Sequence, residues 1–440
     1  MAVSATDPHR AIEAIFRIES PKLIAGLARI VRDVGLAEEL AQDAFVKALE
    51  RWTADGVPSK PGAWLMTTAK RSAIDHYRRS KLLDRKHEEL GREIDAERQR
   101  ALPDLELDDV IDDSVGDDLL RLVFTACHPV LTTDARVALV LRLLGGLTTD
   151  EIARAFLVPA ATIAQRIVRA KRTLAEAQVP FEVPRGPELE ARLASVLEVI
   201  YLVFNEGYSA TAGDDWMRPA LCEDALRLGR ILAELAPQES EVHGLVALME
   251  LQASRLRARI GPSGEPILLF DQDRARWDRL LIGRGLTALA RAEAPGGTAG
   301  PYTLQAGIAA CHARAGKPAD TDWARIVGLY DAIARLAPSP IVALNRAVAV
   351  SMAEGPAAGL AIVDGLRSEP LLEHYHLLPS VRGDLLVKLG RNDEARAEFE
   401  RAAGMTRNAR ERTLLLARAA ASARAARPAS GDSAATLDAG

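Results

Sequence analysis

The sequence contains few aromatic residues, few cysteines and no long apolar run. Phenylalanine, tryptophan and tyrosine make up 4% of its 440 residues. The cysteines, Cys127, Cys222 and Cys311, are far apart and form no CxxC or CxxH pattern. This spacing excludes a disulfide framework and the usual structural zinc sites, so we expect no metal and no cofactor. We find neither a signal-peptide pattern nor about twenty consecutive apolar residues, and we therefore expect a cytoplasmic protein without membrane contact.

The sequence also has no excess of positive charge. Its 56 lysines and arginines are outnumbered by 61 aspartates and glutamates, which gives a formal net charge of −5. Any contact with nucleic acid must therefore come from local basic patches. Hydrophobic residues make up 48% of the chain and alanine and leucine are abundant, a composition that favours helices. We predict an all-α protein of several domains, because 440 residues exceed one ordinary core.

Residues 147–174 are predicted to form two short helices joined by a tight turn at 156–158. Thr148 and Glu151 are spaced to form a capping box at the start of the first helix. Pro159 suits the first turn of the second helix, where no backbone donor is needed. Apolar residues then recur at spacings of four and three and should form one buried stripe: Ile163, Ile167, Ala170 and Leu174.

The opposite face of the second helix carries the side chains that a DNA-recognition helix needs. Arginine pairs with guanine edges or phosphates, glutamine reads adenine, and threonine contacts either. The residues predicted to contact duplex DNA are Thr162, Gln165, Arg166, Arg169 and Arg172. The alternative is a solvated surface helix, since arginine-rich faces are common and Leu157 stands where many such turns have glycine.

A first helical unit is predicted over residues 8–82, with breaks at Ser20-Pro21, around 33–35 and at 55–62. Residues 37–52 form an amphipathic helix whose inward positions are Leu40, Ala44, Ala48 and Trp52. A valine among charged residues marks its outer face as a docking surface. The docking residues are Glu39, Gln42, Asp43, Val46 and Lys47.

The helix predicted over residues 61–81 ends in a basic cluster. Basic side chains interleaved with aromatic ones suit single-stranded DNA, because charges follow phosphates and rings stack on exposed bases. Trp64 and Tyr77 are the rings available for stacking, and the candidate residues of this helix are Trp64, Lys70, Arg71, Asp75, Tyr77, Arg78 and Arg79. Two alternatives remain: Trp64 is a plain core residue, and the basic cluster only offsets the helix dipole.

The rest of the chain divides at its polar and proline-rich stretches. Residues 83–118 are predicted to be a flexible acidic linker, because 101–118 holds eight aspartates and glutamates and no lysine or arginine. A second helical unit spans 119–178, and a proline-punctuated hinge spans 179–187. A helical extension follows at 188–335, then tetratricopeptide-like repeats at 336–427 and a disordered tail at 428–440.

The repeat pattern is clearest at residues 376–408. Leu389-Gly390-Arg391 should close one helix and Asn392-Asp393 should cap the next, whose inner face carries Ala395, Phe399 and Ala402. A weaker copy is predicted at 341–366. Because such hairpins must stack on neighbours, we expect an interaction scaffold rather than a catalytic pocket.

Polar and aromatic residues also interrupt the apolar helices of the extension. They provide a candidate ligand or partner site made of Asn205, Glu206, Asp271, Asp273 and Arg274. The alternative is a buried network of caps and ion pairs that joins neighbouring helices.

Taken in order, the docking helix, the basic helix, the acidic linker and the helix-turn-helix resemble a bacterial RNA polymerase sigma factor of the extracytoplasmic-function type. The resemblance covers about residues 10–178, and the long extension is similar to that of a subgroup with tetratricopeptide-like repeats. It implies that the docking residues face core RNA polymerase, the basic helix melts and reads the downstream promoter element, and the recognition helix reads the upstream element. Arg71 departs from the family pattern, because many members have asparagine there.

The resemblance implies a non-enzymatic subunit that directs transcription initiation, with core RNA polymerase and promoter DNA as partners. The extension would then modulate activity, through a protein or small-molecule regulator. Two alternatives remain open: a DNA-tethered ligand-binding or enzymatic module, and a conventional helix-turn-helix regulator. No catalytic triad spacing or phosphate-binding glycine loop supports the enzymatic alternative.

Overall fold

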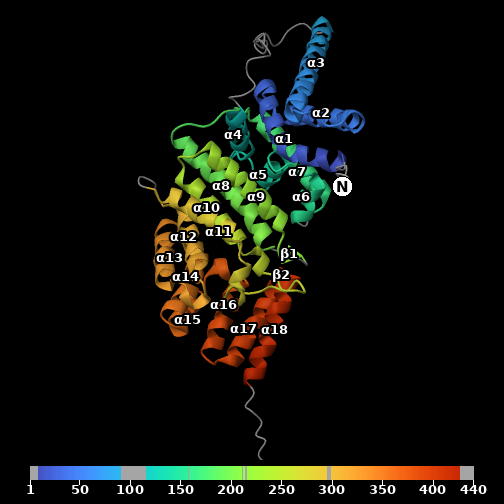
Figure 1. The fold of residues 1–440 in the computed structure, drawn as a ribbon. Helices are drawn as coiled ribbons and strands as arrows, with labels where there is room; N and C mark the ends of the chain where they lie inside the picture. Colours follow the sequence, from blue (N-terminus) through green and yellow to red (C-terminus); the bar gives the residue numbers. More distant parts are fainter. Residues whose placement is uncertain are drawn as a thin grey trace, which may run out of the picture. The chain divides into compact units, whose positions relative to one another are not determined.

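The structure is a computed structural model that describes residues 8–90, 115–156, 158–210, 212–213, 216–294 and 299–426. Within these ranges the chain forms eighteen α-helices, five short 3₁₀ helices and two strands of two residues each. The all-α prediction is therefore confirmed. The chain divides into two compact units, Met1–Leu202 and Val203–Gly440, and Figure 1 shows its helices coloured in sequence order. The predicted tail at 428–440 lies outside the described residues.

The first unit begins with a module of three helices: α1 (Pro8–Val31), α2 (Val34–Asp55) and α3 (Pro61–Leu90). Asp33 fixes the start of α2, because its side chain accepts a hydrogen bond from the Leu36 backbone N–H at 2.9 Å. The apolar stripe of α2 is buried as predicted, at 4% exposure or less for Leu40, Ala44, Ala48 and Trp52. The side chains of this stripe form the core of the module, where α2 packs against α1 and α3.

Two predicted boundaries of this module are wrong. Pro21 does not break a helix, because α1 runs through it without interruption. Proline removes one backbone hydrogen bond, but Leu23, Ile24 and Leu27 beyond it are almost fully buried, and this packing outweighs the loss. The helix that was predicted to end at residue 81 extends to Leu90.

The second module contains α4 (Val115–Ala126), α5 (Thr133–Leu143), α6 (Thr149–Phe156) and α7 (Ala160–Glu176), followed by α8 (Pro187–Tyr208). The capping box is confirmed: the Glu151 carboxylate accepts from the Thr148 N–H at 2.7 Å, and the Thr148 hydroxyl accepts from the Glu151 N–H at 3.2 Å. Pro159 is the residue before α7, rather than part of its first turn as predicted. Leu157 lies outside the described residues.

Both ends of the predicted acidic linker are helical. Residues 83–90 continue α3, and α4 starts at Val115. Asp118 is only 2% exposed and forms ion pairs with Arg29 of α1 at 3.2 Å and Arg121 at 2.6 Å. Because α4 also packs on α1, the two modules of the first unit are in direct contact. Residues 91–114 lie outside the described part of the chain.

The second unit is a succession of stacked helices. Its first half contains α9 (Pro219–Leu235), α10 (Ser240–Ala253), α11 (Arg279–Ala292), α12 (Pro301–Arg314) and α13 (Trp323–Leu336). Between α10 and α11 lie the 3₁₀ helices η1 (Leu256–Ala258), η2 (Leu269–Asp271) and η3 (Arg274–Arg276), and η4 (Pro318–Asp320) precedes α13. Helix α10 packs against α9, α11 and α12, so nearly all of its residues are buried.

The second half contains α14 (Pro340–Ala353), α15 (Pro356–Gly365), η5 (Pro370–Leu372), α16 (Leu377–Lys388), α17 (Asn392–Met405) and α18 (Ala409–Ala426). The two predicted helical hairpins are present, as α14 with α15 and α16 with α17. Ala395, Phe399 and Ala402 are at most 1% exposed, as the repeat pattern predicts. The predicted cap is wrong: Asn392 and Asp393 belong to the first turn, and no side chain caps α17.

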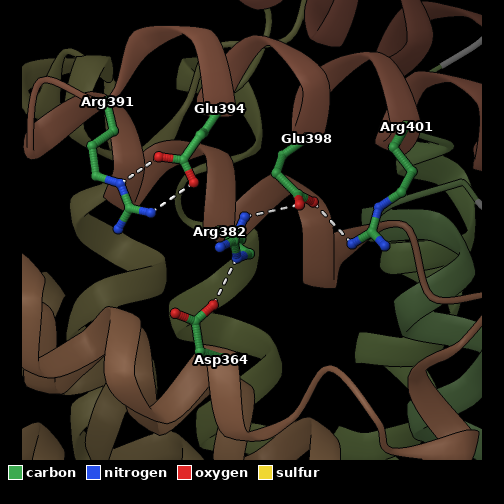
Figure 2. A network of polar contacts seen from close by, with 6 residues as sticks. All are labelled: Asp364, Arg382, Arg391, Glu394, Glu398 and Arg401. Atoms are coloured by element: carbon green, nitrogen blue, oxygen red, sulfur yellow. Dashed lines mark hydrogen bonds and ion pairs between the residues drawn. The ribbon is translucent and has the colours of Figure 1, made fainter.

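A polar network joins three helices of these repeats (Figure 2). Arg382 of α16 is 7% exposed and donates to Asp364 of α15 at 2.7 Å and to Glu398 of α17 at 3.0 Å. Arg401 donates to the second oxygen of Glu398 at 2.9 Å. The two carboxylates neutralise the buried guanidinium, and they raise its pKa although burial opposes this. The network fixes how the two hairpins stack.

The two ends of the second unit are joined. Strand β1 (Ala212–Gly213) pairs in parallel with β2 (Arg407–Asn408), and the buried Asn408 side chain donates to the Ala210 carbonyl at 3.1 Å. The segment between α8 and α9 is therefore bonded to the segment between α17 and α18.

Candidate nucleic-acid interface

The recognition helix α7 presents its two faces as predicted. Ile163, Ile167, Ala170 and Leu174 are at most 6% exposed, and they pack against α5 and α6. Thr162, Gln165, Arg169 and Arg172 are exposed. Arg166 is partly buried, since its side chain is 29% exposed and lies 3.2 Å from the Asp134 carboxylate. Four of the five predicted side chains are thus exposed, and Arg172 among them forms an ion pair with Glu176 at 3.3 Å.

The basic helix α3 has a half-buried beginning and an exposed middle. The Trp64 ring lies against Trp52 in an edge-to-face contact, with 5.2 Å between the ring centres, so part of it belongs to the core. Lys70 is half-buried, whereas Arg71, Asp75 and Arg78 are exposed. The side chains of Tyr77 and Arg79 lie outside the described part of the structure.

The predicted docking face of α2 is also largely exposed. Glu39, Asp43, Val46 and Lys47 are exposed, and Val46 has 56% of its surface accessible. The Lys47 ammonium donates to the Ser72 hydroxyl of α3 at 2.9 Å. Leu49, three residues after Val46 and 40% exposed, belongs to the same face. Sequence reasoning missed it, although the spacing of three in a helix places the two side chains together.

Gln42 is half-buried because it bonds to a carboxylate inside the first unit. Its amide donates to Glu38 at 2.6 Å. Glu38 is 3% exposed and also accepts from Arg142 of α5 at 2.6 Å. Its second carboxylate oxygen forms an ion pair with Lys171 of the recognition helix. One buried carboxylate of the docking helix therefore holds cations from two helices of the helix-turn-helix module.

The charge of Glu38 is stabilised by these partners. Burial alone would raise the pKa of this carboxyl, but Lys171 and then Arg142 lower it below its ordinary value. No local pattern indicates this cluster, since Glu38 and Arg142 are 104 positions apart.

The candidate site in the extension consists of separate structural contacts. Glu206 forms an ion pair with Arg218, and Asp273 caps η3 by accepting from the Ala275 N–H at 2.9 Å. Arg274 is buried and donates to the His312 and Ala315 carbonyls at 2.7 and 2.5 Å, which covers the carboxyl end of α12. Asn205 lies in α8, and Asp271 is exposed in η2. These contacts match the alternative of caps and ion pairs.

The described residues contain no group of three or more histidine, cysteine, aspartate or glutamate side chains placed to hold a metal ion. Cys127, Cys222 and Cys311 are buried thiols, and burial raises the pKa of Cys127 and Cys222 to about 12. In the described part of the chain, no helix is long and apolar enough to cross a membrane.

Family comparisons agree with this arrangement of modules. The Sigma-70 region 2 family matches residues 15–82 and the Sigma-70 region 4 family matches residues 121–174. A family of unknown function (DUF6596) matches residues 192–293. No solved structure matches the chain significantly.

Two proteins are similar to the chain. An uncharacterized protein of Rhizobium meliloti (strain 1021) is 44% identical over 400 residues, which cover 89% of this chain and 91% of that protein. The ECF RNA polymerase sigma factor SigK of Mycobacterium ulcerans (strain Agy99) is 33% identical over 153 residues, which cover 34% of this chain and 75% of that protein.

An all-helical first unit that carries region 2 and region 4 in this order defines a bacterial sigma factor. The chain belongs to the extracytoplasmic-function RNA polymerase sigma factors and has a long helical C-terminal extension. Members of this class bind core RNA polymerase and promoter DNA and are not themselves enzymes.

Proposed function

We propose that this sigma factor uses the exposed face of α2 to bind core RNA polymerase, α3 to contact the melted promoter strand and α7 to read the upstream duplex. The exposed arginines of α7 carry this proposal, because Arg169 and Arg172 extend from a helix whose other face is anchored in the core. The exposed Val46 and Leu49 supply apolar area to the polymerase contact.

We further propose that the helical extension modulates promoter use within the same chain. Its size supports this role, since residues 203–440 form a compact unit of their own. Helix α8 begins in the first unit, where Arg192 donates to the Phe124 carbonyl at 2.9 Å and Ser195 to the Cys127 carbonyl at 2.9 Å. A truncation must keep this helix to leave the second module intact.

Run-off transcription tests both parts of the proposal. Purified full-length chain added to core polymerase should produce transcripts from a matching promoter, whereas a conventional regulator or a tethered enzyme would produce none. A chain that ends after Tyr208 keeps α8 and should give a transcript yield different from that of the full-length chain. A chain that ends after Gln178 also lacks α8, so comparing the two truncations shows the effect of losing that helix. Equal yields from the full-length chain and the Tyr208 truncation under every condition would contradict the modulating role.

A further inference from the structure

A groove with a volume of about 620 Å³ crosses the surface of the second unit. Helix α10 forms its floor through His243, Val246 and Glu250, which follow one stripe of the helix at spacings of three and four. Helices α9 and α11, which both pack on α10 (Figure 1), form its walls. The whole groove lies within the family of unknown function at residues 192–293.

The walls of the groove are rich in arginine. Arg230 of α9 faces Arg279, Arg284 and Arg291 of α11 across the floor, and the carboxylates in the lining are those of Glu234 and Glu250. Arg230 is bonded to Glu250 at 2.8 Å. Arg279, Arg284 and Arg291 are exposed, and within the described ranges none of the three forms an ion pair. The α11 wall therefore carries cationic charge that the described residues leave unneutralised.

The same wall has an apolar position. Leu280 is 68% exposed, although it is large and aliphatic. Gly283, one turn further along α11, has open space where a side chain would be. An apolar side chain of a partner could approach the helix backbone at Gly283 and bury Leu280, which would remove apolar surface from water.

The floor of the groove contains a carboxylate oxygen with an unmet hydrogen-bonding need. Glu250 is 2% exposed, and one of its oxygens has no hydrogen-bond donor among the described residues. A buried acceptor without a donor is costly. This oxygen is closed off from the surface of the groove, so the charge available to a partner is that of the exposed arginines.

From these features we infer that the α9–α11 groove binds an acidic amphipathic peptide segment of a partner protein. Carboxylates of the segment pair with Arg279, Arg284 and Arg291, and an apolar side chain covers Leu280 and Gly283. Nucleic acid is disfavoured, because its charged backbone offers no apolar side chain and would leave Leu280 exposed. This inference rests on the proposed modulating role and names the kind of partner through which the extension acts.

Fluorescence anisotropy of the full-length chain tests the inference. The probe is a labelled peptide of about fifteen residues with leucine at every third or fourth position and glutamate between them. It should bind, and the charge reversals Arg284→Glu and Arg291→Glu together should weaken binding about tenfold or more. The matched control is Arg325→Glu with Arg335→Glu, two exposed arginines of α13 outside the groove, which should leave the affinity unchanged.

Three outcomes would overturn the inference: no binding of the acidic peptide, equal weakening by the control pair, or binding of labelled duplex DNA that the peptide does not displace. A peptide with lysine in place of glutamate should not bind. Because no polymerase is present, a negative result here is separate from a failure of the transcription assay that tests the proposed function. The circular dichroism of both double variants should match that of the natural chain, since all four arginines are exposed.

Discussion

Glu38 and Arg142 form an ion pair at 2.6 Å between the docking helix and the helix-turn-helix module, although they are 104 positions apart. Lys171 of the recognition helix binds the other oxygen of the same carboxylate. The surface proposed to bind polymerase and the helix proposed to read duplex DNA are thus tied to each other through one buried side chain. For the two modules to move apart, this carboxylate has to lose both cations.

Replacing Glu38 should weaken the contact between the two modules, with the packing of α4 on α1 and the Asp118–Arg29 ion pair left in place. Glu38→Ala leaves Arg142 and Lys171 without their shared carboxylate, at a cost of about 3 kcal/mol to the closed arrangement. Fluorophores attached to cysteines introduced at Asp43 and Gln165, both exposed, should show reduced energy transfer. The natural cysteines are buried and should label slowly. Glu39→Ala, an exposed neighbour on α2, is the control and should not change the transfer.

The same contact should weaken in acid. The pKa of Glu38 is lowered in the folded chain, so its stabilising contribution is complete above the ordinary pKa of a glutamate and is lost as the pH falls through the lowered value. Energy transfer in the labelled chain should therefore be constant between about pH 5 and 7 and fall below about pH 4. A chain with Glu38→Gln has no carboxyl group to protonate at this position and should not show this acid-dependent fall in energy transfer. An identical acid profile in both would contradict this assignment.

Arg169 should contribute more to promoter use than Arg166. Arg169 is exposed, whereas Arg166 is engaged with Asp134. Arg169→Ala should weaken promoter use by about 1 to 3 kcal/mol if the side chain is bidentate to a base, and Arg166→Ala should weaken it less. Asp134→Ala frees Arg166 and should increase its contribution. Run-off yield at limiting promoter concentration measures these effects, and Arg185→Ala, an exposed arginine between α7 and α8, is the control. Normal transcription by both α7 variants would refute the proposed orientation of the helix.

Gly383 should not tolerate even one added carbon. A Cβ at this position of α16 would lie 2.7 Å from the Phe399 ring, and Phe399 is 1% exposed and cannot move aside. Gly383→Ala should therefore lower the free energy of unfolding by about 1 to 3 kcal/mol. Gly404→Ala on α17 meets no atom within 4 Å and should be neutral or stabilising by about 0.5 to 1 kcal/mol. Calorimetry of the two variants would show whether their Tm values shift in these opposite directions.

The features predicted correctly from the sequence are those encoded by close neighbours. The capping box of Thr148 and Glu151 and the buried stripes of α2 and α7 depend on residues three or four positions apart, where helix geometry fixes the contact. Pro21 was misjudged because its local effect is overcome by the burial of the residues that follow it. Local rules predict the interior of a helix better than its interruptions.

The features that the sequence did not reveal depend on distant partners. Glu38 looks like one more polar residue of an amphipathic helix, and only the fold brings Arg142 and Lys171 to it. A core role for Trp64 was one of the alternatives from the sequence, but its partner Trp52, which lies on another helix, was not apparent. Three arginines of the α9–α11 groove lie on α11, but Arg230 lies on α9 about fifty positions earlier, and no local spacing relates it to the other three.

The pairing of Ala212–Gly213 with Arg407–Asn408 has a consequence for how the second unit is made. Open repeat arrays can assemble from one end as they leave the ribosome. Here the opening segment has no strand partner until almost two hundred further residues have been synthesised. The pairing of the two strands should therefore form late in synthesis. A chain that stops before Asn408 would leave Ala212–Gly213 without its strand partner.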